Sequence, residues 1–304
     1  MSTLAARRAL PAAALAGVVL TLFYTALIAT ADGITKLFAT TYAAPQLFVI
    51  SGGVVAVLSL AANRRQGRWR GVATRCPRAM ALRAGATVLG SVAFFYAFRL
   101  LPFAEVFLFI ALIPLLAALL SGPTLGETVR PQVWAALGLG TVGVLCLFPA
   151  GLGSVGLGHL VAFAAVLLGT VSMLASRYIG QRDDNLLTQV FYPNLALMAV
   201  MACVLPFVWR PMGLADLGWA LTYAVFLFGA RWVLVAALRL LPAYVVTPLM
   251  NLQFLWMVVI GALAFGEWPG VGVWLGAAIV VAAGTWLVWD QTRPRPPAHA
   301  VPAE

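Results

Sequence analysis

One arginine of this chain lies inside a long apolar segment, where a charged side chain needs a chemical explanation. Arg231 falls about two-thirds of the way along the apolar run Leu217–Leu238. A charge at the centre of a membrane-spanning helix costs about 2.5–3.5 kcal/mol on insertion scales, so such residues usually face a watery cavity or a partner. The planar guanidinium can then bind a carboxylate or a phosphate. The alternative is that Arg231 snorkels toward the membrane interface.

Two amide side chains follow in a later apolar run. Asn251 and Gln253 stand two positions apart, which is about 200° around a helix, so both cannot point into one pocket. One of them can line a cavity while the other bonds a neighbouring helix, the ordinary use of polar groups in membranes. We expect the pair to contribute one ligand-binding side chain.

Opposite charges stand one helical turn apart at the end of the first apolar run. Asp32 and Lys36 are spaced i, i+4, which favours an ion pair within one helix, worth about 0.3–0.5 kcal/mol. The alternative is that the two residues gate the outer entrance of a pathway.

Aromatic side chains can add a stacking surface for a planar substrate. Tyr24, Tyr96 and Trp232 are candidates if they face a central cavity. Most aromatic residues in a membrane bundle instead pack or anchor the helices at the interfaces. These three therefore stay candidate substrate-binding residues.

The composition indicates that helices in a membrane position these residues. The chain of 304 residues is 63% hydrophobic and 9% charged, whereas soluble domains carry about 25% charged residues. Its runs are long and continuous, which predicts spanning helices. The net charge of +10 does not indicate nucleic-acid binding, because the basic residues lie in short gaps between apolar runs.

A span needs about 20 apolar residues, and the sequence supplies ten such runs. They are Leu10–Thr30, Gln46–Ala62, Met80–Leu101, Glu105–Ser121, Val133–Pro149, Gly156–Ala175, Leu186–Val208, Leu217–Leu238, Tyr244–Phe265 and Val271–Trp289. The first resembles a secretory signal, but its apolar run of about 20 residues exceeds the usual 7–15. We therefore expect it to stay as a span.

The chain repeats itself after 140 positions. Arg99-Leu100-Leu101-Pro102 matches Arg239-Leu240-Leu241-Pro242, Gly126-Glu127 matches Gly266-Glu267, and Val133-Trp134 matches Val273-Trp274. We interpret residues 10–149 and 156–289 as two five-helix repeats, followed by a disordered cytoplasmic tail at 290–304. Because five is odd, the second repeat enters the membrane from the opposite side.

Inverted repeats are typical of secondary transporters, whose substrate binds between the halves near the midplane. Pro114 in the fourth run and Pro248 in the ninth place a helix breaker in equivalent helices. Kinked helices beside a central cavity suit alternating access, so both prolines are candidate hinges.

Basic residues predict the orientation. With the N-terminus inside, fifteen arginines fall on the cytoplasmic side and only Lys36, Arg99 and Arg210 fall outside. Cytoplasmic loops carry the excess of Lys and Arg, so both termini are expected in the cytoplasm.

Several motifs resemble one transporter family. "DGITKLFA" at 32–39, "FFYAFRLLPFAEV" at 94–106, the two Gly-Glu pairs and "VTPLMNLQFLWMVVIGALAFGEWP" at 246–269 look like the EamA type of the drug/metabolite transporter superfamily. The chain is most similar there to bacterial carriers that include riboflavin and S-adenosylmethionine uptake proteins. The resemblance implies ten spans in two inverted repeats and a bacterial inner membrane. Many relatives carry a basic residue in the second span, where this chain reads Ile50-Ser51-Gly52.

The sequence thus predicts an all-α membrane transporter for a small amino-acid-, flavin- or nucleoside-derived metabolite. A membrane enzyme of lipid or prenyl transfer that uses Asp183-Asp184 and a channel remain alternatives. We expect no catalytic site, metal, cofactor or nucleic acid. The expected partners are the lipid bilayer and the substrate, with the protein a monomer or a homodimer.

Overall fold

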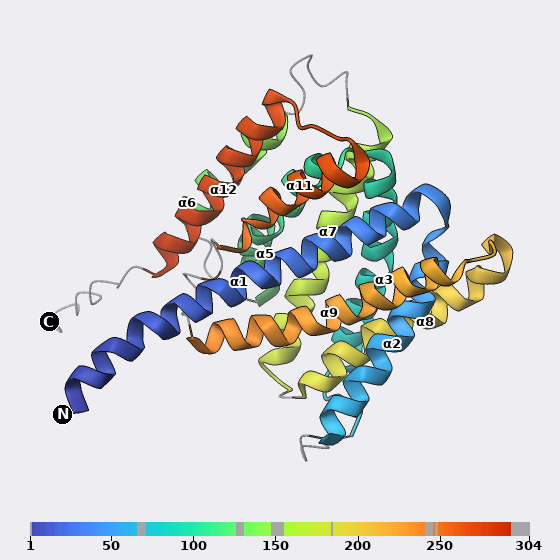
Figure 1. Ribbon diagram of the computed structural model, residues 1–304, viewed down its shortest axis with the longest axis horizontal. Coiled ribbons are helices and arrows are strands. Elements are labelled where there is room, and N and C mark those ends of the chain that lie inside the picture. The colour runs from blue at the N-terminus through green and yellow to red at the C-terminus, as the bar shows by residue number, and fades with distance from the viewer. Residues whose placement is uncertain are drawn as a thin grey trace, which may run out of the picture.

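The computed structural model of the protein is a bundle of helices (Figure 1). It describes residues 2–65, 71–125, 131–146, 155–183, 185–240, 246 and 249–292. All regular elements within these ranges are helices. They are α1 (Ser2–Thr41), α2 (Ala44–Arg65), α3 (Pro77–Leu100), α4 (Phe103–Ile110), α5 (Ile113–Leu125), α6 (Pro131–Leu145), α7 (Leu157–Gly180), α8 (Leu186–Val208), α9 (Leu214–Leu240), α11 (Gln253–Phe265) and α12 (Val271–Thr292).

Several helices are long and apolar enough to cross a membrane, as the composition predicts. Seven such segments occur among the described residues: Leu15–Thr41, Ala44–Ala62, Pro77–Leu100, Phe103–Gly122, Leu157–Gly180, Leu187–Val208 and Leu214–Leu234. Three apolar helical segments are shorter: Trp134–Leu145, Gln253–Phe265 and Val271–Trp286. The all-helical character is therefore confirmed, with seven candidate spans, whereas the number ten stays a prediction.

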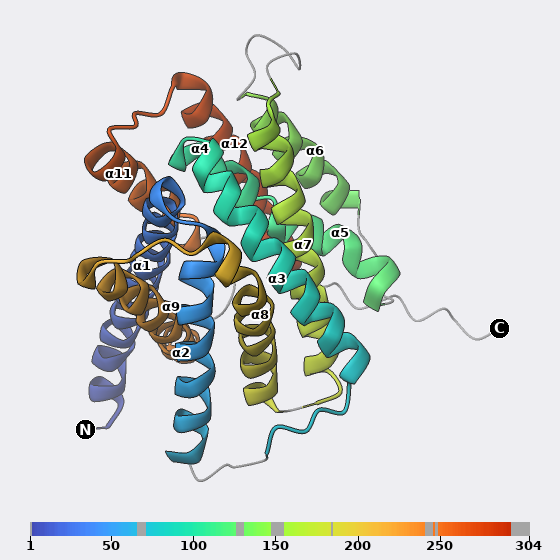
Figure 2. The ribbon, with the colours of Figure 1, turned by 90° about the vertical axis from the view of Figure 1, so that its right-hand side faces the viewer.

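The bundle has two ends that are defined by helix termini. At one end, called the Thr41 end, α1, α3 and α8 finish and α2 and α9 begin. At the other, called the Asp183 end, α2 and α7 finish and α3 and α8 begin. The helices pair as α1 with α9, α2 with α8 and α3 with α7, and Figure 2 shows several of these helices side by side.

Two apolar clusters hold the described helices together. The larger centres on α4, with Phe103, Phe107 and Leu108 at most 3% exposed, and extends to α11, α12 and α7. The smaller joins the Thr41 ends of α1 and α2 to α3 and α8 around Phe38, Leu47 and others. Burial of such side chains stabilises by about 1.5–3 kcal/mol each in water, and inside a membrane the same contacts act through close packing.

The first helix differs from its predicted span. The run was expected to end at Thr30, but α1 continues to Thr41 and its candidate span covers Leu15–Thr41. The helix continues past Asp32 and Lys36, whose side chains find polar partners on other segments: Gln253 on α11 and Glu267 in the segment after α11. Both charges therefore lie within the span and not beyond its end.

The fourth and ninth predicted runs are not continuous helices. Turns at 111–112 and 251–252 separate α4 from α5 and precede α11. At both turns the backbone tightens to i→i−3 bonds: Leu112 N–H donates to Phe109 O at 3.0 Å and Leu252 N–H to Leu249 O at 3.1 Å. The two sets of residues are 140 positions apart, the offset of the sequence repeat.

The prolines explain these breaks only in part. Pro114 is the second residue of α5, where its missing N–H leaves the carbonyl of Ile110 without the usual i→i−4 donor. Pro248, the other candidate hinge, lies outside the described residues. The predicted tail also lies outside them from residue 293 onward, whereas residues 290–292 belong to α12.

Candidate functional site

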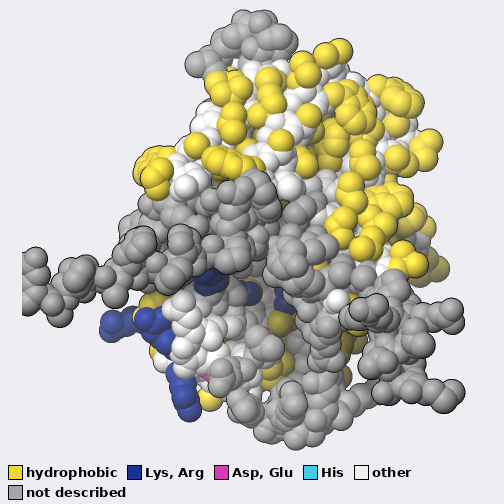
Figure 3. Space-filling view, turned by 90° about the vertical axis from the view of Figure 1, so that its left-hand side faces the viewer, with side chains coloured by type: hydrophobic (Ala, Val, Ile, Leu, Met, Phe, Trp, Pro, Cys, Tyr) yellow, Lys and Arg dark blue, Asp and Glu magenta, His cyan; other side chains and the backbone are white. Residues whose placement is uncertain are grey.

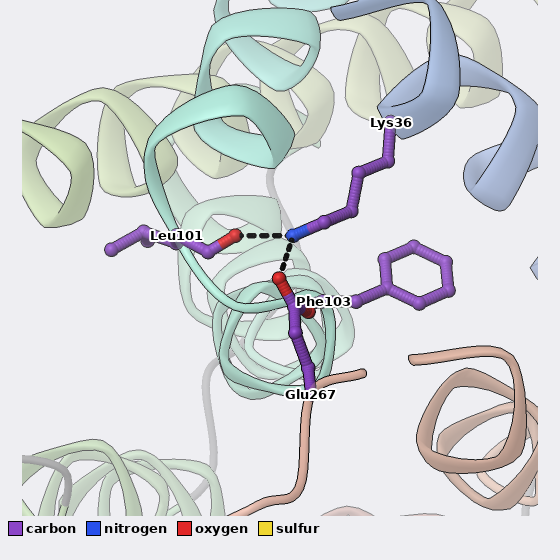
Figure 4. A network of polar contacts seen from close by, with 4 residues as sticks. All are labelled: Lys36, Leu101, Phe103 and Glu267. Atoms are coloured by element: carbon purple, nitrogen blue, oxygen red, sulfur yellow. Dashed lines mark hydrogen bonds and ion pairs between the residues drawn. The ribbon is translucent and has the colours of Figure 1, made fainter. Parts of the chain in front are cut away.

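A buried lysine at the Thr41 end joins three segments that are remote in sequence. Lys36 Nζ on α1 lies 2.8 Å from Glu267 Oε1 and donates to the carbonyl oxygen of Leu101, also at 2.8 Å. The other oxygen of the glutamate, Oε2, accepts the backbone N–H of Phe103 at 2.7 Å (Figure 4). Lys36, Leu101, Phe103 and Glu267 are called the Lys36 network below.

Local structure explains why Glu267 reaches this position. The helix α11 ends at Gly266, whose φ of +67° is the left-handed conformation that glycine adopts without strain. The next residue folds back, with its N–H donating to Gly261 O at 2.9 Å. The carboxylate thereby meets the first N–H groups of α4, where a negative charge is favourable.

The expected ion pair between Asp32 and Lys36 is not present. Lys36 is only 5% exposed, and its amine forms an ion pair with Glu267 and not with Asp32. Asp32 instead accepts a hydrogen bond from Gln253 Nε2 through Oδ2 at 2.9 Å. The carboxylate of Glu267 instead caps the start of α4.

Asp32 lies at the centre of a polar group between α1, α9 and α11. Gln253, the first residue of α11, directly follows the second helix break and is 9% exposed. The hydroxyls of Tyr24 and Tyr223 interact electrostatically with the Asp32 carboxylate. No Lys, Arg or His that the structure describes forms an ion pair with Asp32.

Arg231 is connected to this group through Tyr24. The guanidinium on α9 interacts electrostatically with Tyr24 on α1 and with Arg83 on α3. Arg231 is exposed as a residue. Figure 3 shows Lys and Arg side chains in and beside a hollow on the side of the molecule where both termini lie.

The other sequence candidates are placed less centrally. Tyr96 is 36% exposed and contacts Phe95 edge-on, while Trp232 is 48% exposed and contacts Phe228 on its own helix. Asn251 lies in the second break, where its carbonyl accepts the N–H of Phe254 at 3.1 Å. The structure brings Tyr24, Asp32, Gln253 and Arg231 together, and it does not join Tyr96 or Trp232 to them.

A second pair of ionisable groups lies beside the Lys36 network. His159 Nε2 at the start of α7 is 3.7 Å from Glu105 Oε2 in the first turn of α4. Glu105 and Glu267 both line a cavity of about 50 Å³, enough for one or two water molecules. Glu105 also complements the dipole of α4, because an acid in the first turn of a helix is favourable.

The loops at the Asp183 end are tied together by one carboxylate. Asp183 accepts hydrogen bonds from Arg75 N–H at 2.9 Å, Asn185 N–H at 3.0 Å and Thr74 Oγ1 at 3.1 Å. The N–H of Arg75 contributes most to holding the pKa of Asp183 below its usual value, and the other donors add to it. These contacts give Asp183 a structural task, and Asp184 lies outside the described residues.

Comparisons with known proteins identify the fold alone. No protein-family model and no curated protein sequence matches the chain. A solved structure, described only as the crystal structure of a protein, superposes with a TM-score of 0.61 at 20% sequence identity. The match covers 93% of this chain and 99% of that one, so the two share their overall architecture.

Proposed function

We propose that the protein is a secondary transporter that moves a small organic metabolite across the bacterial inner membrane by alternating access. The observation that carries the proposal is the pair of helix breaks at 111–112 and 251–252, with matching i→i−3 bonds 140 positions apart. Interrupted helices at corresponding positions of two halves are the best sequence-level guide to a transporter's substrate site.

The breaks support the interpretation of the chain as two inverted repeats. The sequence offset that joins the two Arg-Leu-Leu-Pro motifs also joins the two breaks. An equal offset in sequence landmarks and backbone geometry is expected if one five-helix unit was duplicated. The shorter helices α6, α11 and α12 then serve as spans together with the seven longer segments.

The substrate site in this proposal is the polar group at the second break. Asp32 and Gln253 supply an acceptor and an amide, and Tyr24 extends the group toward Arg231. Uncompensated charges within membrane spans are costly and are kept where they bind or conduct a ligand. Arg231 then contacts the substrate, as the sequence predicts, and does not simply snorkel.

Alternating access needs one closed and one open end. The Lys36 network joins α1, α4 and the segment after α11 at the Thr41 end, whereas the hollow of Figure 3 opens beside basic side chains. If both termini are cytoplasmic, the Lys36 network lies toward the outside and the hollow opens toward the cytoplasm. The network then acts as the outer gate, in which Lys36 takes part without Asp32.

The rival classes have less support. A transferase that uses the acidic loop would need free carboxylates, but Asp183 already accepts three hydrogen bonds within the loops. A channel needs a path open at both ends at once, and the contacts of the Lys36 network oppose such a path at the Thr41 end.

Flux through proteoliposomes tests the proposal. Compounds from the amino-acid, flavin, nucleoside and S-adenosyl classes are first screened for a concentration-dependent rise in the Tm of the purified protein, because a ligand stabilises the state that it binds. A compound that binds should show saturable uptake. Unsaturating flux would assign a channel, and binding without any flux would assign neither carrier nor channel.

The variant Arg231→Leu links flux to the site. Loss of a charge-assisted contact costs about 1.5–3 kcal/mol, or about ten- to a hundredfold in substrate affinity. Arg231→Lys should restore only part of this loss, because an ammonium lacks the planar fork. Transport by Arg231→Leu with unchanged apparent affinity would remove Arg231 from the site.

A further inference from the structure

Two arginines within candidate membrane spans interact electrostatically with each other. Arg83 lies in the span Pro77–Leu100 on α3, and Arg231 lies in Leu214–Leu234 on α9. Their guanidinium groups are close enough to repel each other. Neither forms an ion pair with any Asp or Glu among the described residues. The sequence had assigned Arg83 only to the cytoplasmic arginines.

Arg83 is held in a fixed orientation by neighbouring polar side chains. Its Nη1 donates to Gln189 Oε1 on α8 at 3.1 Å, and Ser176 Oγ on α7 donates to the same oxygen at 2.7 Å. Gln189 is only 7% exposed, so its position is fixed by packing. Three helices thus hold the guanidinium in place.

The hydrogen-bonding capacity of the two arginines is not filled. The buried Nε of Arg83 has no hydrogen-bond partner in the part of the chain that the structure describes. A buried donor without a partner costs about 1–3 kcal/mol, and a like-charged neighbour adds to this cost. Such an arrangement is unfavourable in the empty protein, and an anion placed between the two forks relieves both penalties at once.

We propose that Arg83 and Arg231 form a two-arginine subsite that binds a carboxylate or phosphate group of the transported compound. The inference rests on the proposed function and narrows its substrate class to anions or zwitterions. The oxygens of a carboxylate or a phosphate match the paired N–H donors of a guanidinium group. This match favours both anions over a simple halide. Tyr24 interacts electrostatically with both Arg231 and Asp32 and so connects the subsite to the Asp32 carboxylate.

Thermal unfolding of the purified full-length protein tests the subsite. Sodium phosphate and sodium acetate are titrated separately in a neutral detergent, with ionic strength held constant by sodium chloride. At least one of them should raise the Tm of the wild type in a saturable way. Arg83→Gln and Arg231→Gln should each weaken the apparent Kd about ten- to a hundredfold. Arg99→Gln, on the same helix as Arg83 but at the Thr41 end, should respond like the wild type.

A second readout separates a binding role from a structural one. Arg231 makes no hydrogen bond with the residues that the structure describes, so Arg231→Gln should raise the Tm in chloride alone by removing repulsion. If Arg83→Gln fails to fold, Arg83→Lys replaces it. The lysine keeps the charge, so this variant should show an intermediate response to the anion. A saturable rise that both glutamine variants retain, or no rise with either anion, would overturn the inference.

The anion can come from a soluble compound or from a lipid headgroup. The titration is therefore repeated in nanodiscs of phosphatidylcholine with and without phosphatidylglycerol. A response to phosphate or acetate that persists in both supports a substrate subsite. Stabilisation by phosphatidylglycerol that abolishes the response would assign the arginines to lipid and reject the inference. Saturable flux without any anion effect would leave transport standing and reject only the subsite.

Discussion

At the scale of single residues, the Lys36 side chain joins three segments at the Thr41 end. The Lys36 amine is shared between a carboxylate and a backbone carbonyl, and it lies 5.4 Å from the centre of the Phe265 ring. Loss of one partner from a largely buried pair leaves the other charge poorly solvated. A small change at either residue should therefore loosen the whole end.

The variant Glu267→Gln should open the Thr41 end. The amide keeps an acceptor for Phe103 N–H but loses the charge that holds Lys36, at a cost of about 1–3 kcal/mol. Ala104→Cys, buried beside the small cavity, serves as a reporter in a protein free of its native cysteines. Maleimide should label it several times faster with Glu267→Gln. Glu105→Gln, which faces His159 instead, is the matched control. Equal labelling in both variants would show that the ion pair does not close this end.

Asp183 should make stability depend on pH in the acidic range. Its pKa is lowered in the folded protein, so its carboxylate stabilises the fold above its ordinary pKa of about 4. That stabilisation is lost as pH falls through the lowered value. Asp183→Asn should therefore lower the Tm at pH 7, at a cost of about 1–3 kcal/mol.

The comparison across pH provides the control for Asp183. The difference in Tm between the wild type and Asp183→Asn should shrink as pH falls below about 4, because the unfolded wild type then takes up a proton that the folded protein binds only at lower pH. A difference that stays constant down to pH 3 would mean that shape, and not charge, ties the two loops together.

At the scale of elements, α6 and α12 approach each other through glycines. A Cβ at Gly276 would overlap the carbonyl oxygen of Gly143, and a Cβ at Gly272 would overlap that of Cys146. Small residues four apart allow such close contact between membrane helices, where packing replaces the hydrophobic effect as the driving force. This contact joins helices from the two proposed repeats.

Gly276→Ala should therefore destabilise the protein although alanine is the better helix former. The methyl group must push α6 away, and overpacking of this kind costs about 1–3 kcal/mol. A Cβ added at Gly284 on the same helix meets no described atom within 4 Å. Gly284→Ala should therefore keep or raise the Tm, because alanine favours the helix by about 1 kcal/mol relative to glycine. Equal Tm changes for the two variants would contradict the close contact.

The elements were partly predictable from the sequence, because apolar length is a local signal. The run Leu186–Val208 matches α8 at both ends, since no charge interrupts it. The end of α1 was missed because Asp32 and Lys36 look like an interface until their partners are known. The helix breaks were expected at the prolines, yet the second falls at Asn251, where turn formation competes with the helix.

The candidate site was less predictable for a related reason. Lys36 and Glu267 are separated by 231 positions, and no local pattern links two such residues. Arg231 was found because a charge inside an apolar run is conspicuous. Arg83 was missed because it lies near the start of its run, where arginines usually face the interface. Only the positions of Gln189 and Ser176 reveal that it is held inside the bundle.

At the scale of the whole molecule, inverted repeats make a prediction about sidedness. The two Arg-Leu-Leu-Pro motifs are near-identical in sequence, so a parallel duplication would place them on the same side of the membrane. Five helices per repeat place them on opposite sides. The first motif lies at the Thr41 end, at the junction of α3 and α4.

Cysteine labelling of intact cells decides between the two arrangements. In a protein without native cysteines, an impermeant maleimide should label Arg99→Cys, whose side chain is exposed at the Thr41 end. It should not label Ala243→Cys until the membrane is permeabilised, because the excess of arginines keeps that turn inside. Arg182→Cys, exposed at the Asp183 end, should behave like Ala243→Cys and reports the same side independently. Labelling of both motifs in intact cells would rule out inversion. Labelling of only Ala243→Cys and Arg182→Cys would keep the inversion but reverse the orientation, and the Lys36 network would then close the cytoplasmic side.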